Sequence, residues 1–386
     1  MSSDVPDSLD LTNLQVWGLD LSYFTGKIEA YLRVKQIPYV LREMDYRRFL
    51  AIGRKTGFRQ MPQLELADGS WLTDTPFIVD RIEESHKERS ITPDDRVLRF
   101  LAHLLEDYGD EHLWRPALYY RWAFANDAQL MSARIARGML RDIPLPFFLR
   151  QHYIRRRQTI VFLDQDGVNS RTAKSVADHY LETLAAVETI LAQRPFLLGE
   201  QPSRADFGFM GSMFRHFFCD PTPGAIMRAQ APLTHEWVAR MWAGARDAFD
   251  PAAKTDQSTL APSKSPLTLP ASLCQRILGE FLPYLIANAD AYARHAPKVH
   301  WQSGDVAFVT PVNPYRVWRW NRLLELFGRL SVAEQIAVGA VMSGGDVGAS
   351  SQENALGASA LRLLRSPKPA RLPSLSAPAS RDRQWR

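Results

Sequence analysis

The first part of the chain alternates between short apolar runs of strand length and stretches with a helical period. Residues 14–19 (LQVWGL) form an apolar run, and apolar side chains from Phe24 and Ile28 onward then recur at the spacing of one helix face. Pro38 ends this helix, and residues 39–44 (YVLREM) alternate in the manner of a second strand. The pattern therefore begins as strand, helix, strand.

A hairpin and a further helix follow. A short polar helix is expected around 46–55, before residues 61–66 (MPQLEL), an Asp-Gly turn and another short strand. Pro76 stands just inside the start of a helix at 75–85, where its missing N–H costs nothing. The predicted order is βαβαββα.

Beyond residue 94 the apolar positions follow a helical period with no convincing strand between them. Helices are expected at 96–124, about 128–141, 171–193, 203–218 and 232–247. A Pro/Ser/Thr-rich break is followed by a helix at 272–293, a short strand at 305–310 and a Trp-rich helix at 314–329. From about 343 the composition turns to Ser, Ala, Pro and Arg.

These patterns predict an α/β domain followed by an all-α domain, with additions at the C-terminal side. The expected units are an α/β domain at 12–90, a helical domain at 91–249, a linker at 250–271, a helix-rich extension at 272–342 and a disordered tail at 343–386. A chain of 386 residues with 46% hydrophobic content can bury two or three cores.

Charge and cysteine content exclude several classes of function. A net charge of +5 is mild for this length, and the arginine run at 155–157 is typical of a solvated helix face, so nucleic-acid binding is not expected. Cys219 and Cys274 belong to no CxxC or His-containing metal spacing, so no metal is expected. The first residues lack the features of a secretion signal, and no apolar run reaches 18 residues. A cytoplasmic protein without membrane contact is the expectation.

The first chemical signal is a group of three hydroxyls, on Ser22, Tyr23 and Thr25, where the first strand meets the first helix. Helix N-termini favour anions, and a thiol placed there has its pKa lowered because the thiolate gains the helix dipole and a hydroxyl hydrogen bond. Ser22 acting only as an N-cap would give the same local pattern.

Two further signals lie at the starts of later elements. Pro62 in Gln60-Met61-Pro62 directly precedes a strand, and a cis Met61-Pro62 bond would leave the Met61 backbone ready to pair with a ligand; a simple strand-start proline is the alternative. Asp74 and Thr75 could hold the ammonium and carboxylate of an amino-acid head group, or could be an ordinary helix cap.

Together these segments resemble the glutathione transferase superfamily. The matching residues are SYFTGK at 22–27, Gln60-Met61-Pro62 in the place of the family's Gln-Val-Pro, and Asp74-Thr75 in the place of its acidic-Ser pair. PFLLGEQPSRADF at 195–207 is similar to the family's C-terminal signature, in which Ser203 and Asp206 form a structural N-capping box. The resemblance covers roughly residues 14–247, and the extension to about 330 is similar to a long bacterial subgroup.

The resemblance implies a thioredoxin-like glutathione-binding domain and a glutathione transferase-like enzyme that conjugates glutathione, as co-substrate, to a small electrophile in detoxification. Ser22 would stabilise the thiolate, with Tyr23 and Thr25 as reserves, since the first helix does not begin with a cysteine and no tyrosine stands on the first strand. Met61 would pair with the cysteine backbone beside Pro62.

The resemblance also assigns the two ends of glutathione. Gln60 would hold the glycyl side, and Asp74 and Thr75 would hold the γ-glutamyl end. The electrophile would enter from the helical domain, where the candidate wall residues are Tyr108, Trp114, Tyr119 and Tyr120, which fit equally well as core residues. By analogy the protein would be a homodimer. Two alternatives stay open: a non-catalytic interaction module with the same fold, and a glutathione-dependent peroxidase or reductase.

Overall fold

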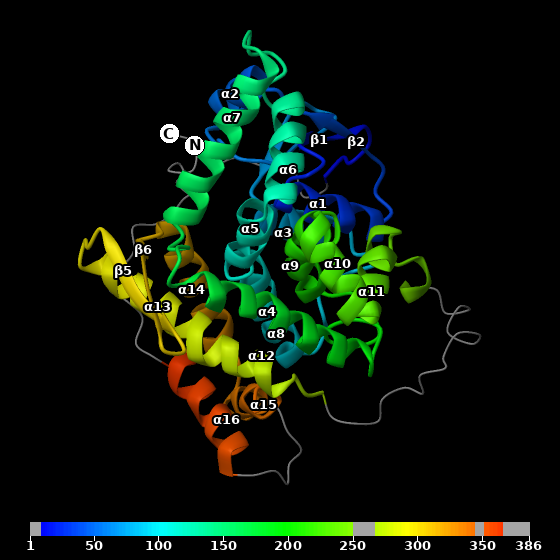
Figure 1. Cartoon of the computed structure of the whole chain (residues 1–386). Helices are drawn as coiled ribbons and strands as arrows, with labels where there is room; N and C mark the ends of the chain where they lie inside the picture. The colour runs from blue at the N-terminus through cyan, green and yellow to red at the C-terminus, as the bar shows by residue number, and fades with distance from the viewer. Residues whose placement is uncertain (1–8, 250–266, 344–350, 366–386) are drawn as a thin grey trace.

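The structure is a computed structural model, which describes residues 9–249, 267–343 and 351–365 (Figure 1). The elements of the first domain are β1 (Leu14–Gly18), α1 (Tyr23–Val34), β2 (Tyr39–Glu43), α2 (Tyr46–Thr56), β3 (Gln63–Glu65), β4 (Trp71–Thr73) and α3 (Thr75–Ser85). The predicted order βαβαββα is therefore confirmed.

The first domain is built on a four-stranded sheet in the order β2-β1-β3-β4. Val16 at the centre of β1 pairs with Leu41 of the parallel strand β2 and with Leu64 of the antiparallel strand β3. Val16 and Leu64 are fully buried. This is the expected thioredoxin-like arrangement, and it places the end of β1 beside the start of β3, where the candidate site residues lie.

The second domain is helical, as predicted. Its elements are α4 (Arg96–Glu111), α5 (Trp114–Ala123), α6 (Ala125–Gly138), α7 (Phe147–Gln158), the π-helical segment η1 (Thr159–Asp164), α8 (Ala173–Leu191), α9 (Arg204–Ser212), the π-helical segment η2 (Met213–Phe218), α10 (Pro221–Gln230), α11 (Pro232–Trp242) and the 3₁₀ turn η3 (Arg246–Phe249). The expected single helix at 96–124 is two helices, and α7 and α10 were not predicted.

The two domains and the extension meet around α4 and α9. These helices cross so closely that a Cβ on Gly208 of α9 would lie 2.5 Å from the Cα of Glu106 on α4. Only glycine allows such an approach between two backbones. Lys27 of α1 reaches the same region and pairs with Glu106 and Asp110.

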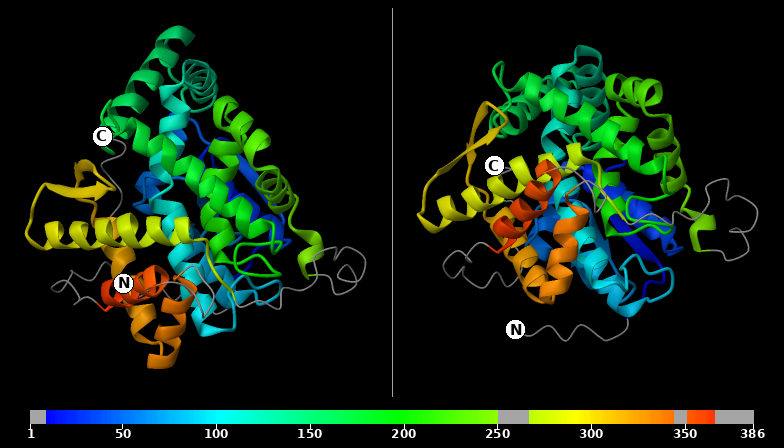
Figure 2. Two further views of the ribbon diagram at one scale, coloured as in Figure 1. Left: turned by 60° about the horizontal axis from the view of Figure 1, so that its bottom comes forward. Right: turned by 90° about the horizontal axis from the view of Figure 1, so that it is seen from below.

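The extension contains helices and a β-hairpin. Its elements are α12 (Ala271–Arg276), the π-helical segment η5 (Ile277–Phe281), α13 (Leu282–Ala293), β5 (Lys298–Ser303), β6 (Val306–Pro311), α14 (Pro314–Gly328), α15 (Val332–Val341) and α16 (Ser351–Leu364). β5 and β6 form an antiparallel pair, of which the sequence predicted only the second strand. Figure 2 shows that the hairpin projects from the body of the molecule, whereas α13 runs along the body.

The structure corrects one expectation on the C-terminal side, and other expected segments lie outside the described residues. Residues 351–364 form helix α16, so a disordered segment from 343 is wrong for these residues. The remaining expected tail residues, 344–350 and 366–386, lie outside the described residues, as does most of the expected linker, 250–266.

Buried ion pairs attach α14 to the rest of the molecule. Arg319 contacts Asp107 and Asp110 of α4, and Arg316 Nε lies 2.9 Å from Glu111 Oε2. All of these side chains are at most 7% exposed. Since breaking a buried pair leaves an uncompensated charge, α14 is held firmly against α4.

Candidate functional site

Ser22 lies where the chain leaves β1 and begins α1. Its backbone is extended, with φ −78° and ψ 134°, and its Oγ accepts a hydrogen bond from the Thr25 N–H at 3.4 Å, so it is the N-cap of α1. The side chain is half-buried and lines a cavity of about 150 Å³. Capping and a role in the cavity are therefore compatible.

Arg121 of α5 ties the loop before Ser22 to the helical domain. Its Nη1 donates to the carbonyl oxygen of Leu21 at 3.0 Å, and the same guanidinium binds both carboxylate oxygens of Asp220. Arg121 and Asp220 are both buried. No local pattern in the sequence indicates Arg121, because its partners are far away in the chain.

The other two predicted hydroxyls do not face the cavity as Ser22 does. The Tyr23 hydroxyl donates to the carbonyl oxygen of Gly109 at 2.5 Å, so only its ring is left to line the cavity. Thr25 is fully buried against β1, where a Cβ on Gly18 would lie 2.4 Å from its Oγ1. The geometry therefore favours Ser22 over both reserves.

The segment Gln60-Met61-Pro62 contains a cis Met61-Pro62 peptide bond. Gln63, which is fully buried, holds the preceding loop: its Nε2 donates to the carbonyl oxygens of Phe58 at 2.6 Å and Gln60 at 3.0 Å. Gln63 therefore fixes the conformation of the loop before Pro62, and no local pattern in the sequence indicates this contact.

Asp74 and Thr75 begin α3 and are both buried, at 7% and 4% exposure. Asp74 has φ +66°, a conformation that is strained for a residue with a side chain and that is common at functional sites. Its Oδ1 accepts a hydrogen bond from the hydroxyl of Tyr315 at 3.1 Å. Tyr315 belongs to α14, so the extension reaches the predicted site.

Ser22 and Thr75 line two adjoining cavities. Ser22 lines the cavity of about 150 Å³, and Asp74 and Thr75 line a second cavity of about 10 Å³, which has room for a single water molecule. Three residues line both cavities: Phe24, Gln60 and Met61. The predicted site residues are thus brought together, and the cavity beside Thr75 is the smaller of the two.

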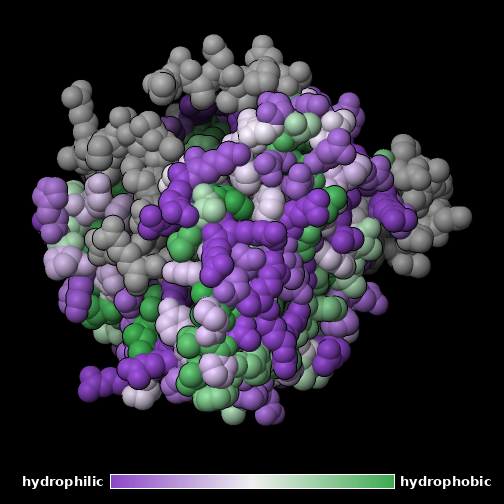
Figure 3. Space-filling model, turned by 90° about the horizontal axis from the view of Figure 1, so that it is seen from above, coloured by the Kyte–Doolittle hydropathy of each residue, from purple (hydrophilic) through white to green (hydrophobic). Residues whose placement is uncertain are grey.

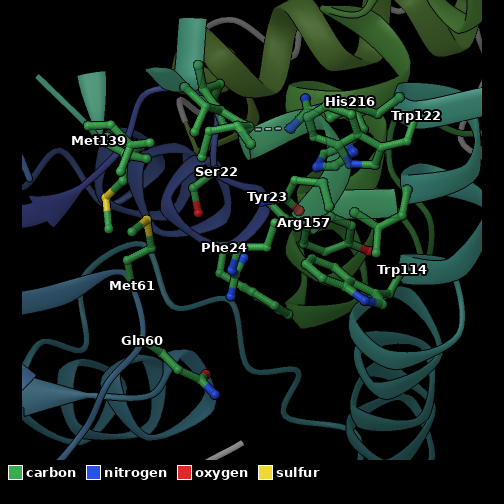
Figure 4. Close-up of a pocket in the computed structure, with 18 of the residues that line it drawn as sticks. Ser22, Tyr23, Phe24, Gln60, Met61, Trp114, Trp122, Met139, Arg157 and His216 are labelled. Atoms are coloured by element: carbon green, nitrogen blue, oxygen red, sulfur yellow. Dashed lines mark hydrogen bonds between the residues drawn. The ribbon is translucent and has the colours of Figure 1, made fainter. Parts of the chain in front are cut away.

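The larger cavity, which we call the Ser22 cavity, is mainly apolar. Figure 4 shows the Ser22 hydroxyl directed into it, with Met61 and Met139 on one side and aromatic side chains on the other. Its aromatic and aliphatic lining comprises Leu19, Leu21, Tyr23, Phe24, Tyr46, Met61, Trp114, Leu118, Trp122, Ile135, Met139, Leu140, Tyr153 and Ile154. Such a lining suits a flat apolar ligand.

Of the four predicted wall residues, only Trp114 lines this cavity. Tyr108 is fully buried elsewhere, with its hydroxyl 2.7 Å from His179 Nε2. Tyr119 and Tyr120 pack edge to face against each other. For these three tyrosines the alternative of core packing holds and the wall assignment does not, because the sequence does not show which side of a buried helix faces a cavity.

Helix α7 supplies the wall that the prediction lacked. Tyr153, Ile154, Arg157 and Gln158 line the Ser22 cavity, whereas Arg155 and Arg156 are exposed. The arginine run is therefore a solvated face only in part. Burial lowers the pKa of Arg157, and the Tyr153 hydroxyl, its hydrogen-bond partner, opposes this; the guanidinium stays cationic.

The outer surface around α6 and α7 is mixed in character. Figure 3 views this end of the molecule and shows hydrophilic side chains interrupted by hydrophobic ones. Phe148 of α7 is 67% exposed and Leu149 is 44% exposed. The Ser22 cavity is thus bordered by a helix whose outer face is partly apolar.

His216 in η2 also lines the Ser22 cavity, although it is packed as a core residue. Its Nδ1 lies 3.1 Å from the carbonyl oxygen of Ala117, which can only accept, so Nδ1 carries the proton. Burial, and then the charge of Arg121, hold the pKa of His216 well below its usual value. The ring is therefore neutral at pH 7, and His216 is a core histidine whose Nδ1 has a hydrogen-bond partner.

Ser203 and Asp206 form the predicted capping box at the start of α9. Asp206 accepts from the backbone N–H groups of Ser203 at 2.8 Å and Leu197 at 3.0 Å, and from the indole of Trp237. All three donors are buried, so the box stabilises the helical domain.

Residues 9–249, 267–343 and 351–365 contain no group of three or more His, Cys, Asp or Glu side chains that could hold a metal ion. Within the same ranges, no helix has both the length and the apolar character needed to cross a membrane. Cys219 and Cys274 are both free thiols.

Comparison with known proteins agrees with this architecture. The fold is that of a two-domain protein with a thioredoxin-like domain followed by a helical domain. Residues 17–90 match the model of the glutathione S-transferase N-terminal domain, and residues 144–244 match that of the glutathione S-transferase C-terminal domain. The chain belongs to the glutathione S-transferase superfamily.

Three solved structures illustrate the similarity of this chain to known proteins. A glutathione S-transferase from Rhodospirillum rubrum F11 is 20% identical, covers 65% of this chain and 96% of its own, and has a TM-score of 0.39. A beta-etherase from Sphingobium sp. strain SYK-6 is 19% identical, covers 63% of this chain and 98% of its own, and has a TM-score of 0.42. A glutathione transferase homolog from a Drosophila species, with bound glutathione, is 19% identical, covers 63% of this chain and 93% of its own, and has a TM-score of 0.39. No curated protein matches the chain.

Proposed function

We propose that this protein is a glutathione-dependent transferase that joins the thiol of glutathione to a small apolar electrophile. The observation that carries the proposal is the position of Ser22: its hydroxyl lies at the N-terminus of α1 and lines a mainly apolar cavity that Met61 also lines. A thiol brought there would meet the positive end of the helix and a hydroxyl donor.

The residues on the thioredoxin-like side would bind and orient the tripeptide. Met61 would pair through its backbone with the cysteinyl part, Gln60 would hold the glycyl side, and Asp74 and Thr75 would take the γ-glutamyl head group. The neighbouring cavities that share Gln60 and Met61 support this arrangement.

Ser22 would favour the thiolate by donating its hydroxyl proton in a hydrogen bond to the sulfur. Each unit by which the thiol pKa falls corresponds to about 1.4 kcal/mol of stabilisation of the thiolate. While the thiol pKa lies well above 7, each such unit also gives about ten times more thiolate at pH 7. The sulfur then attacks the electrophilic carbon, a carbon–sulfur bond forms, and the leaving group departs with its electron pair. The aromatic lining, including Trp114, would hold the electrophile.

The test is thiol transfer to 1-chloro-2,4-dinitrobenzene by the full chain and by Ser22→Ala. We expect kcat/KM to fall at least tenfold in this variant, while Ser70→Ala, an exposed serine in a turn, stays within twofold. Equal activity of the Ser22→Ala and Ser70→Ala proteins would overturn the proposed role of Ser22. Turnover with a hydroperoxide alone would identify the peroxidase alternative.

The non-catalytic alternative also has an observation in its favour, since the cavity beside Asp74 is small. Binding of glutathione measured by calorimetry, without turnover of any electrophile or hydroperoxide, would support it. A homodimer in the cytoplasm, acting in detoxification, remains a proposal from the superfamily; light scattering of the purified full chain tests the dimer.

A further inference from the structure

Helix α14 of the extension lies against α3, the helix that begins at the predicted glutamyl subsite. Arg322 Nη2 lies 2.8 Å from Asp80 Oδ2, and the Trp318 ring stacks on Phe77 with centroids 5.0 Å apart. At the start of α14, the Tyr315 hydroxyl donates to Asp74 Oδ1 at 3.1 Å. The extension thus contacts the first turn of α3 from outside the two domains of the superfamily.

Tyr315 binds one oxygen of the carboxylate that would take the ammonium of a γ-glutamyl group. It is 5% exposed, its ring centroid lies 5.5 Å from that of Trp318, and the cavity left beside Asp74 and Thr75 is about 10 Å³. Tyr315 is not among the residues that line this cavity, so the group that it occupies is the Asp74 carboxylate. An ammonium group that pairs with Asp74 Oδ1 must displace the Tyr315 hydroxyl.

The backbone of α14 is not the part that moves. Arg316 and Arg319 bind Glu111, Asp107 and Asp110 in buried pairs, which hold the helix on α4. Asn313 caps the helix, and its side chain accepts from the Tyr315 N–H at 3.0 Å. Displacement therefore falls to the side chain of Tyr315, through rotation about its own bonds.

We propose that Tyr315 is a specificity-determining residue that competes with the glutamyl ammonium for the Asp74 carboxylate and sets the preference of the site among thiols. The inference rests on the proposed function. The phenol is a neutral donor to the Asp74 carboxylate, and an ammonium group is a stronger one, so glutathione displaces Tyr315 but loses affinity in doing so. A thiol without a γ-glutamyl group does not compete with Tyr315 for Asp74 and does not lose that affinity.

The test compares glutathione with cysteinylglycine, which is the same thiol without the γ-glutamyl group. Calorimetry on the full chain measures Kd for both ligands in the wild type, Tyr315→Phe and Tyr315→Ala. We expect Kd for glutathione to fall about tenfold in both variants and Kd for cysteinylglycine to stay within twofold. Tyr292→Phe, a hydroxyl deletion on α13 outside the site, should change neither.

The outcomes separate this inference from the proposed function. Unchanged or weaker glutathione binding in Tyr315→Phe, or an equal change for both thiols, overturns the role of Tyr315 and leaves the proposed function standing. If neither thiol binds to the wild type or to any variant, and none of these proteins transfers a thiol to 1-chloro-2,4-dinitrobenzene, both proposals fail. Tyr315→Phe keeps the ring and therefore the packing against Trp318, and its melting temperature verifies that a change in Kd is not caused by unfolding.

Discussion

Lys27 Nζ on α1 lies 2.7 Å from Asp110 Oδ2 on α4, and both side chains are closed to water. The same ammonium group lies 2.8 Å from Glu106 Oε1, and Arg204 and Arg319 bring two further positive charges to these carboxylates. Charges that are removed from water in this way are stable only while each has its partner. The first domain, the helical domain and the extension therefore depend on one buried ionic network.

Removing the ammonium group of Lys27 should destabilise the whole molecule. We expect Lys27→Met to lower the free energy of unfolding by about 3–5 kcal/mol, because Glu106 and Asp110 remain buried without it. Urea denaturation followed by circular dichroism measures the change. In the matched control Lys174→Met, the ion pair with Asp178 is exposed, and we expect a change of less than about 1 kcal/mol. Similar losses in the two variants would contradict the structural role of Lys27.

A second prediction concerns the histidine pair between α4 and α8. The rings of His112 and His179 lie 4.6 Å apart, and burial holds the pKa of both well below the usual value. The charges of Arg276 and Glu280 also act on His179, in opposite directions. A base with a depressed pKa in the folded state contributes stability above the unfolded pKa of about 6.5 and loses it as the pH falls.

We therefore expect unfolding to become easier from pH 7 to pH 5, and this dependence to be shallower in His179→Gln, which keeps an acceptor for the Tyr108 hydroxyl. The upper limit of the difference is about 1.4 kcal/mol per pH unit. Urea titrations at pH 5, 6 and 7 measure it, with the exposed His152→Gln as the control. Parallel curves for the wild type and His179→Gln would show that this histidine is not held neutral.

The contact between α4 and α9 gives a prediction about packing alone. In Gly208→Ala the new methyl group would lie 2.5 Å from the Cα and 2.8 Å from the carbonyl oxygen of Glu106, so the two backbones must separate. We expect a loss of about 3 kcal/mol in the free energy of unfolding. Gly328→Ala meets no atom within 4 Å at the end of α14 and should be neutral or stabilising by up to about 1 kcal/mol. Thermal denaturation of both variants decides the matter, and a stable Gly208→Ala protein would mean that α4 and α9 lie farther apart.

The sequence predicted the first domain well because its signals are local. Strand alternation, the Ser22 cap, Pro62 and Pro76 each fix a boundary within a few residues. Helix α7 was missed because it buries only Ile154 and Gln158 and therefore lacks an apolar face. Helix α10 begins with Pro and Gly, which are poor helix formers.

Only those site residues that belong to short sequence motifs were predicted. Ser22, Gln60, Met61, Asp74 and Thr75 come from three local patterns, and the sheet brings them together. The hydrogen bond between Tyr315 and Asp74 joins residues 241 positions apart, and no local spacing indicates such a contact. The wall of the Ser22 cavity likewise depends on how helices turn relative to one another.

The corrected wall of the Ser22 cavity leads to the last prediction. Trp114 stacks on Phe24 at a centroid distance of 5.9 Å and lines the cavity, whereas Tyr119, five residues along the same helix, does not. In Trp114→Leu we expect KM for 1-chloro-2,4-dinitrobenzene to rise about tenfold, since an aromatic contact contributes roughly 1 kcal/mol beyond the area it buries, while KM for glutathione changes less than twofold. Tyr119→Phe is the control and should alter neither value. Steady-state kinetics with each substrate varied in turn separates the two, and an equal rise in both KM values would mean that Trp114 supports the domain as a whole and does not hold the electrophile.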